Sequence, residues 1–202
     1  MILHFADKRF QNLFIYRFLT SIFLFYLLVV FSAQVIGAEE IQNTDHSRWL
    51  HGFRIGILAH DVPLWSRTRS EGGFDLNAEV IFNFPDISLF TGKIYSNLGF
   101  SLNSQGDTNT LYSGLLWEYA RPSGLFFNFG LGLALHDGEL QPGYDDKKAL
   151  GSRVLFRIPV ELGLRFAKYH GVSILFVHVS NAYLADPNEG LDALGLRYTY
   201  WF

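Results

Sequence analysis

Hydrophobic and polar residues alternate with a period of two along most of the chain after His51. The alternation is clearest at 74–84, 125–136 and 153–166, where one set of alternate residues is apolar and the other mainly charged, amide or glycine. Because side chains on a strand point alternately to opposite faces, this pattern predicts strands with one apolar face. Weaker versions of the pattern occupy 52–60, 93–103, 110–120, 172–180 and 192–202. The sequence therefore predicts about eight strands, each near the roughly ten residues that a tilted strand needs to cross a bilayer.

Turn-forming residues separate these segments. Glycine, proline, serine and asparagine gather at 70–73, 103–107, 121–124 and 168–171, and a longer loop is expected at 136–150. Pro159 lies inside a predicted strand and has no N–H, so we expect a bulge or a missing ladder hydrogen bond there.

The end of the chain favours a membrane barrel. Its last strand alternates Leu194, Leu196, Tyr198, Tyr200 and Phe202, and it resembles the terminal strand of bacterial outer-membrane proteins. A bilayer admits only helices or closed barrels, since every backbone polar group needs a partner. We therefore predict an all-β fold, an eight-stranded antiparallel transmembrane β-barrel of the bacterial outer membrane.

The alternative is a soluble lipocalin-like barrel with an apolar lumen. Its polar face would point outward and would carry more lysine and glutamate. Here that face is rich in glycine, asparagine and paired charges, for which we expect Glu161 to lie near Arg157 and Arg165. Such a face fits a small, packed, polar interior.

Composition narrows the class further. Of 202 residues, 49% are hydrophobic and 17% aromatic, which excludes a disordered chain, and 17% are charged, which argues against a polytopic helical protein. Aromatic excess is typical of strands at a lipid interface. We expect interfacial girdles from the four tryptophans Trp49, Trp65, Trp117 and Trp201, although Trp201 has the parity of the inner face.

The first 38 residues predict a secretory signal peptide. Lys8, Arg9 and Arg17 precede an apolar run at 18–31, and small residues end at Ala38 before two glutamates. The alternative is an uncleaved membrane anchor, for which the apolar run is short. We expect residues 39–202 to form the mature barrel domain.

Charge and residue usage exclude several kinds of chemistry. The net charge is −3 and no basic stripe is present, so we expect no nucleic-acid partner. Without cysteine there is no thiolate nucleophile or disulfide. His51, His60 and His136 have no metal-ligand spacing, and we predict no metal and no cofactor.

One candidate for catalysis lies near the end of the chain. His178 and Ser180 are two residues apart in a predicted strand, so they share a face. A histidine can take the serine proton, and a carboxylate on its other nitrogen fixes the tautomer. Asp192, at the start of the next strand, has the parity of the lipid-facing residues of the last strand. We therefore expect a hydrolytic site on the outer wall, suited to an acyl chain within the membrane.

A longer motif surrounds these residues. The chain reads His178-x-Ser180-Asn181-Ala182, followed by Pro187-Asn188-x-Gly190. This stretch resembles the lipid A 3-O-deacylase family (PagL-like, acyloxyacyl hydrolases), whose members are eight-stranded outer-membrane barrels. The resemblance implies a serine esterase that removes the 3-position ester-linked acyl chain of lipid A in lipopolysaccharide, within the outer membrane.

The same resemblance assigns roles to residues. It implies that His178 and Ser180 are catalytic, and that Asn181 and Asn188 lie around the oxyanion. The acidic member of the family's triad is usually glutamate, and its position falls on Asp192, which is one methylene shorter. This departure supports an alternative hypothesis, a non-catalytic barrel of the same ancestry with a structural or adhesive role. A third hypothesis is a soluble lipid-binding barrel.

Overall fold

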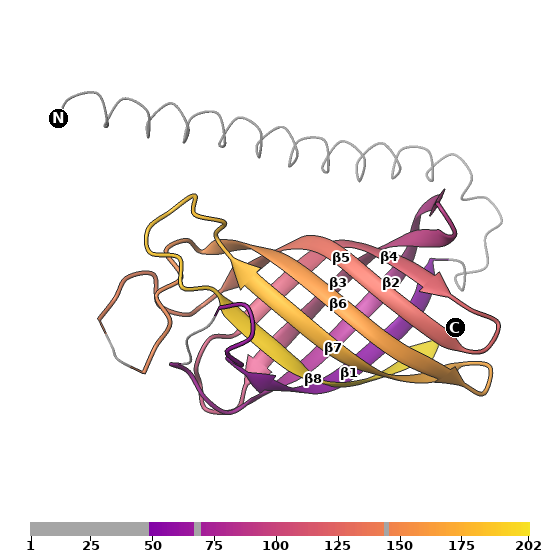
Figure 1. Cartoon of the computed structure of the whole chain (residues 1–202), viewed down its shortest axis with the longest axis horizontal. Helices are drawn as coiled ribbons and strands as arrows, with labels where there is room; N and C mark the ends of the chain where they lie inside the picture. Colours follow the sequence, from indigo (N-terminus) through magenta and orange to yellow (C-terminus); the bar gives the residue numbers. More distant parts are fainter. Residues whose placement is uncertain (1–48, 67–69, 144–145) are drawn as a thin grey trace, which may run out of the picture. The chain divides into compact units, whose positions relative to one another are not determined.

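The protein forms a closed barrel of eight antiparallel strands (Figure 1). The structure is a computed structural model that describes residues 49–66, 70–143 and 146–202. The predicted signal peptide, residues 1–38, lies outside the described residues. Among the described residues, no helix is long and apolar enough to cross a membrane.

Each strand pairs with its neighbour in the sequence, and the first closes onto the last. The closing ladder runs from Gly52 opposite Trp201 to His60 opposite Ala193. The strands are β1 Leu50–His60, β2 Phe74–Leu89, β3 Gly92–Asn103, β4 Thr110–Ala120, β5 Leu125–His136, β6 Val154–Phe166, β7 His170–Ser180 and β8 Leu191–Trp201. Seven of them lie within two residues of their predicted bounds at each end, and the all-β prediction is confirmed.

β2 is the exception, because it continues to Leu89 rather than ending at Phe84. Its pairing with β3 is interrupted between Phe82 and Ile87 and then resumes. Pro85 lies in this interruption, where the ladder needs no N–H from it. The alternation of hydrophobic and polar residues breaks at this irregularity, so the sequence pattern did not predict that the strand continues beyond it.

The predicted effect of Pro159 is also seen. β5 and β6 pair at Val160 with Phe129 and again at Arg157 with Gly132, but not at the two positions between. The register is the same on both sides, so a ladder bond is missing and no residue is inserted. On the other side of β6, Pro159 pairs with Val177 of β7.

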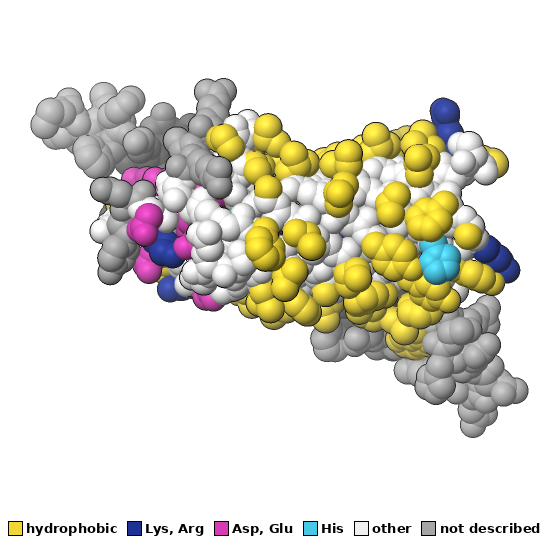
Figure 2. Space-filling model, turned by 90° about the horizontal axis from the view of Figure 1, so that it is seen from below, with side chains coloured by type: hydrophobic (Ala, Val, Ile, Leu, Met, Phe, Trp, Pro, Cys, Tyr) yellow, Lys and Arg dark blue, Asp and Glu magenta, His cyan; other side chains and the backbone are white. Residues whose placement is uncertain are grey.

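The outer wall of the barrel is apolar. Exposed side chains include Ile57, Leu131, Leu162, Ile174 and Leu196, the last of which is 69% exposed. Figure 2 shows hydrophobic side chains over the wall of the barrel and acidic side chains gathered at one end. An apolar belt of this kind requires lipid around it, so the soluble alternatives are wrong.

The interior holds a network of buried ion pairs. Arg54 lies 3.1 Å from Glu79 and 3.2 Å from Glu118, and Arg197 donates to both oxygens of Glu161 at 2.8 and 2.7 Å. All these side chains are buried, and each of these five charges has an opposite partner, as a dry interior demands.

The pairing within this lumen differs from the one we expected. Arg157 lies over the Tyr112 ring at 3.7 Å, and Arg165 lies over the Trp201 ring at 3.9 Å. The ion-pair partners of Glu161 come instead from β8 and β1, which lie two and three strands away from β6 in the closed barrel. The sequence pattern identifies the inward face, but closure of the barrel decides which inward charges meet.

The two ends of the barrel differ. The connections after β2, β4 and β6 are short, whereas those after β1, β3, β5 and β7 are longer and meet at the other end, here called the loop end (Figure 1). In outer-membrane barrels, the longer loops face the cell exterior. The loop end is where His178, Ser180 and Asp192 lie.

Candidate active site

His178 and Asp192 are direct partners across the β7–β8 ladder. Their alternate neighbours Ile174 and Leu196 are also paired, and both point to the outside. Because side chains two residues apart share a face, the His178 and Asp192 side chains lie on the lipid-facing wall at the loop end. The two side chains therefore lie on the face that parity counting predicted for them.

The side chains form a continuous chain of hydrogen bonds. His178 Nδ1 lies 2.6 Å from Asp192 Oδ1, and His178 Nε2 lies 3.0 Å from Ser180 Oγ. With the proton of a neutral imidazole on Nδ1, Nε2 is the acceptor that faces the serine hydroxyl. The Asp192 side chain is fully buried, His178 is 7% exposed, and Ser180 is half-buried. This arrangement can remove a proton from Ser180 while a carboxylate holds the imidazole.

The second carboxylate oxygen of Asp192 is held by a loop. The backbone N–H groups of Trp65 and Ser66 donate to Asp192 Oδ2 at 2.5 and 2.7 Å. The backbone N–H of Val62 also donates to the Asp192 carbonyl oxygen at 3.0 Å. The connection after β1 therefore crosses the end of β8 and covers the carboxylate.

The Trp65 ring lies on the imidazole of His178. Their centroids are 4.4 Å apart, and their planes differ by 16°. We expected Trp65 in an interfacial girdle, and sequence reasoning missed its contact with His178. The chain offers little signal for this contact, because Trp65 follows β1 in a loop and lies 113 positions before His178.

Asn181 and Asn188 shape the connection after β7. The Asn181 N–H donates to Asn188 Oδ1 at 3.0 Å, while Asn181 Nδ2 donates to Leu150 O and Pro187 O at 2.9 and 2.8 Å. Both hydrogens of the Asn181 amide are thus engaged in holding the loop. In Asn188 the oxygen is engaged, so its Nδ2 is the side-chain group that can donate elsewhere.

Gly190 gives the histidine its space. Its φ is +66°, and a side chain there would place Cβ 3.2 Å from His178 Cε1 and 3.7 Å from Ser180 Cβ. Glycine adopts this backbone conformation without the cost that other residues incur. The glycine of the motif therefore allows the loop to pass close to the His178–Ser180 pair.

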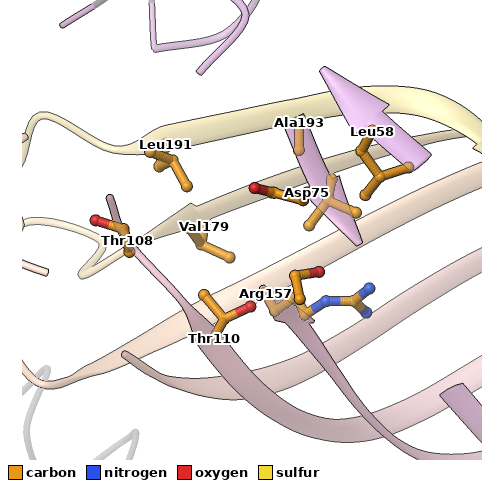
Figure 3. A pocket seen from close by; sticks show the side chains of 10 residues that line it. Leu58, Asp75, Thr108, Thr110, Arg157, Val179, Leu191 and Ala193 are labelled. Atoms are coloured by element: carbon orange, nitrogen blue, oxygen red, sulfur yellow. The ribbon is translucent and has the colours of Figure 1, made fainter. Parts of the chain in front are cut away.

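The cavity on the inner side of this wall is too small for a substrate tail. A cavity of about 20 Å³ lies behind the wall, lined by inward side chains that include Val179, Leu191, Asp75 and Arg157 (Figure 3). That volume holds about one water molecule. Since Ser180 and Asp192 alternate with these inward residues, a substrate must approach Ser180 from the outside.

The other histidines of interest lie elsewhere. His60 is buried between Glu71 and Asp75, each at 2.8 Å, and His136 lies 2.6 Å from the Ser152 carbonyl oxygen. Within the described ranges, no group of three histidine, aspartate or glutamate residues has the arrangement of a metal site.

Relatives of this chain carry a named activity. The lipid A deacylase PagL of Pseudomonas aeruginosa is 33% identical over 73 residues, which cover 36% of this chain and 40% of that protein. The lipid A deacylase PagL of Bordetella bronchiseptica is 36% identical over 55 residues, which cover 27% of this chain and 31% of that protein. The chain thus matches less than half the length of these curated relatives.

A solved structure agrees with the architecture. The crystal structure of the outer membrane enzyme PagL aligns with a TM-score of 0.57 at 24% identity and covers 74% of this chain and 98% of that chain. This likeness supports the barrel fold. A family model described as lipid A 3-O-deacylase (PagL) matches residues 56–201, the whole of the site included. The chain is therefore an outer-membrane β-barrel that belongs to the lipid A 3-O-deacylase (PagL) family.

Proposed function

We propose that the protein is a serine esterase that hydrolyses the 3-position ester-linked acyl chain of lipid A. The hydrogen-bonded chain from Asp192 through His178 to Ser180 carries this proposal. Its place supports a membrane substrate, because it lies on the lipid-facing wall at the loop end. Lipopolysaccharide in the surrounding leaflet would then present its ester bonds to Ser180 from the side.

In the proposed reaction, Ser180 Oγ attacks the ester carbonyl carbon while His178 Nε2 takes the hydroxyl proton. The tetrahedral intermediate collapses, the bond to the sugar oxygen breaks, and His178 returns the proton to that oxygen. Water then attacks the acyl carbon with His178 again as base, the bond from that carbon to Ser180 Oγ breaks, His178 returns the proton to Oγ, and the fatty acid leaves. Throughout, Asp192 accepts the Nδ1 hydrogen bond and stabilises the imidazolium that forms.

Asn188 is the side chain that we assign to the oxyanion. Its Oδ1 accepts from the Asn181 N–H, so its Nδ2 is the group that can donate. One such donor is worth about 3 kcal/mol in the transition state. Asn181 would act through the loop instead, because its amide hydrogens bind two carbonyl groups.

The geometry of Asp192 supports retained catalysis, although its side chain is one methylene shorter than the family's usual glutamate. Asp192 reaches His178 at 2.6 Å because the two residues are ladder partners, and no longer side chain is needed. The competing hypothesis is a barrel with a structural or adhesive role and no chemistry. It would leave unexplained why three hydrogen-bonding groups are aligned on an apolar wall.

The test is mass spectrometry of lipid A from cells that express the wild type or Ser180→Ala. We expect loss of one hydroxyacyl mass with the wild type and an intact lipid A with Ser180→Ala. Equal amounts of folded barrel in the membrane serve as the control. Unmodified lipid A in both strains would favour the non-catalytic barrel.

We also propose that residues 1–38 are removed on export. Sequencing the N-terminus of the protein from purified outer membranes should then begin at Glu39. A chain that begins at Met1 in the membrane would favour the uncleaved anchor.

A further inference from the structure

The connection that follows β1 contacts the proposed acid and base at the same time. Trp65 and Ser66 donate backbone hydrogen bonds to Asp192 Oδ2, and the Trp65 ring covers one face of the His178 imidazole. These two contacts come from one short segment that is distant in sequence from β7 and β8. A single residue, Trp65, takes part in both.

The backbone contacts fix the direction of the carboxylate. A carboxylate has two oxygens that can each accept several hydrogen bonds. In Asp192, Oδ2 accepts from the two loop N–H groups, and Oδ1 is left facing His178 Nδ1 at 2.6 Å. Aspartate has few rotatable bonds, so this fork holds its Oδ1 at the imidazole.

The ring contact acts on the base. A stacked indole limits rotation of the imidazole about its side-chain bonds and keeps Nε2 directed at Ser180. In the reaction His178 becomes a cation, and a cation over an indole face is stabilised by the ring electrons. The contact is therefore stronger in the charged intermediate than in the resting state, which is the condition for a gain in rate.

The same ring separates charge from lipid. Trp65 is 56% exposed on the outer side, whereas Asp192 behind its backbone is fully buried. A carboxylate open to hydrocarbon would be costly. The Trp65 indole covers the His178–Asp192 pair, so these polar side chains can lie within an apolar outer wall.

The start and the end of this connection are anchored. The Asp61 carboxylate accepts from the N–H groups of Ser70 and Glu71 at 2.6 and 3.0 Å, which ties the two ends of the loop together. Lys148 Nζ lies 3.3 Å from Asp61, and both side chains are buried. The position of Trp65 is thus set by the fold rather than by contact with a substrate.

We propose that Trp65 is a positioning residue for hydrolysis, through the orientation of Asp192 and the stacking on His178. This inference rests on the proposed function, because it concerns the same acid and base. Trp65 acts on the turnover step and not on binding of the lipid. Its replacement should therefore lower kcat with little change in KM.

The experiment measures kcat and KM of the purified full-length protein, folded in detergent, on hexa-acylated lipid A. Trp65→Leu keeps the backbone donor and an apolar side chain but removes the ring, and we expect kcat to fall about tenfold with KM within twofold. Trp65→Phe retains a ring and should keep at least half of the wild-type kcat. Leu64→Ala, a change at the adjacent exposed apolar residue, is the matched control and should match the wild type.

Two outcomes overturn the inference, namely a wild-type kcat in Trp65→Leu, or a raised KM with kcat unchanged. Ser180→Ala separates this failure from that of the proposed function. If Ser180→Ala retains full activity, the proposed function fails. If Ser180→Ala is inactive and Trp65→Leu matches the wild type, then only the role of Trp65 is lost.

A second measurement covers the case in which Trp65→Leu does not fold. Wild-type protein labelled with 5-fluorotryptophan gives a ¹⁹F resonance for Trp65, assigned by its absence in Trp65→Phe. Because the ring lies on the imidazole, the chemical shift of this resonance should differ between the wild type and His178→Gln. An identical chemical shift in both proteins would overturn the stacking role.

Discussion

Buried charges have different partners in the lumen and on the outer wall. In the lumen, arginines and glutamates from β1, β2, β4, β6 and β8 neutralise each other in a closed network. On the wall at the loop end, the Asp192 carboxylate is held instead by backbone N–H groups and a histidine. Paired charges stabilise a fixed structure, whereas a carboxylate whose partner is a histidine can stabilise the proton that this histidine takes from the serine.

This comparison predicts which changes affect chemistry and which affect folding. Substitutions in the wall site should abolish activity and leave the barrel stable. Substitutions in the lumen network should destabilise the barrel and leave the activity of the folded fraction unchanged. The predictions below test this division, from the largest expected effect to the smallest.

Replacement of the base should have the largest effect. His178→Ala removes the group that takes the Ser180 proton, and we expect kcat to fall by about 10⁴-fold or more. Its free energy of unfolding in detergent, measured by urea titration, should remain close to that of the wild type. His170→Ala, at the opposite end of the same strand, is the matched control and should keep kcat within twofold. A similar loss of activity in both variants would show that the activity does not depend specifically on the wall site.

Loss of a charge in the lumen should have the second largest effect, and this effect should be on the stability of the barrel. Glu161→Gln removes a buried counter-charge that Arg197 and Arg54 share and leaves Glu79 between both arginines, and we expect a loss of about 3 kcal/mol in the free energy of unfolding. The folded fraction should retain kcat within twofold, since Glu161 lies inside the barrel. Glu139→Gln, at an exposed loop position, should change stability by less than about 0.5 kcal/mol. A stable Glu161→Gln barrel would show that the network is not needed for the fold.

The smallest effect concerns the loop end and depends on pH. Burial raises the pKa of Glu71, but hydrogen bonds from the His60 side chain, the Lys148 N–H and Thr108 outweigh it, so this pKa lies below its ordinary value of 4.5. A lowered pKa in the folded state means that Glu71 contributes its full stability above pH 4.5 and loses it as pH falls through the lowered value. Glu71→Gln should therefore be less stable than the wild type near pH 7 by about 1 kcal/mol.

The measurement is the difference in unfolding free energy between these two proteins at several pH values. That difference should shrink as the solution is acidified below pH 4.5. A difference that stays constant with pH would mean that the Glu71 carboxylate contributes nothing through its charge.

The sequence alone determined the periodic part of this protein. Clear alternation along β5 and β6 predicted their bounds closely, because a strand with one face in lipid and one in a polar lumen has little freedom of register. The same parity counting placed His178 and Asp192 on one outer face. It worked because the two strands are joined by one connection and pair directly.

Only the tertiary structure decided which groups meet from distant parts of the chain. Closure of β1 onto β8 brings Trp65 and Ser66 to Asp192, and it brings Arg54 to Glu161. The period-two pattern does not predict either set of contacts. Alternation indicates the face to which a side chain points, but not which side chains from other strands it meets. Loop residues such as Trp65 have no periodicity at all, and their position depends on the anchors that the folded barrel provides.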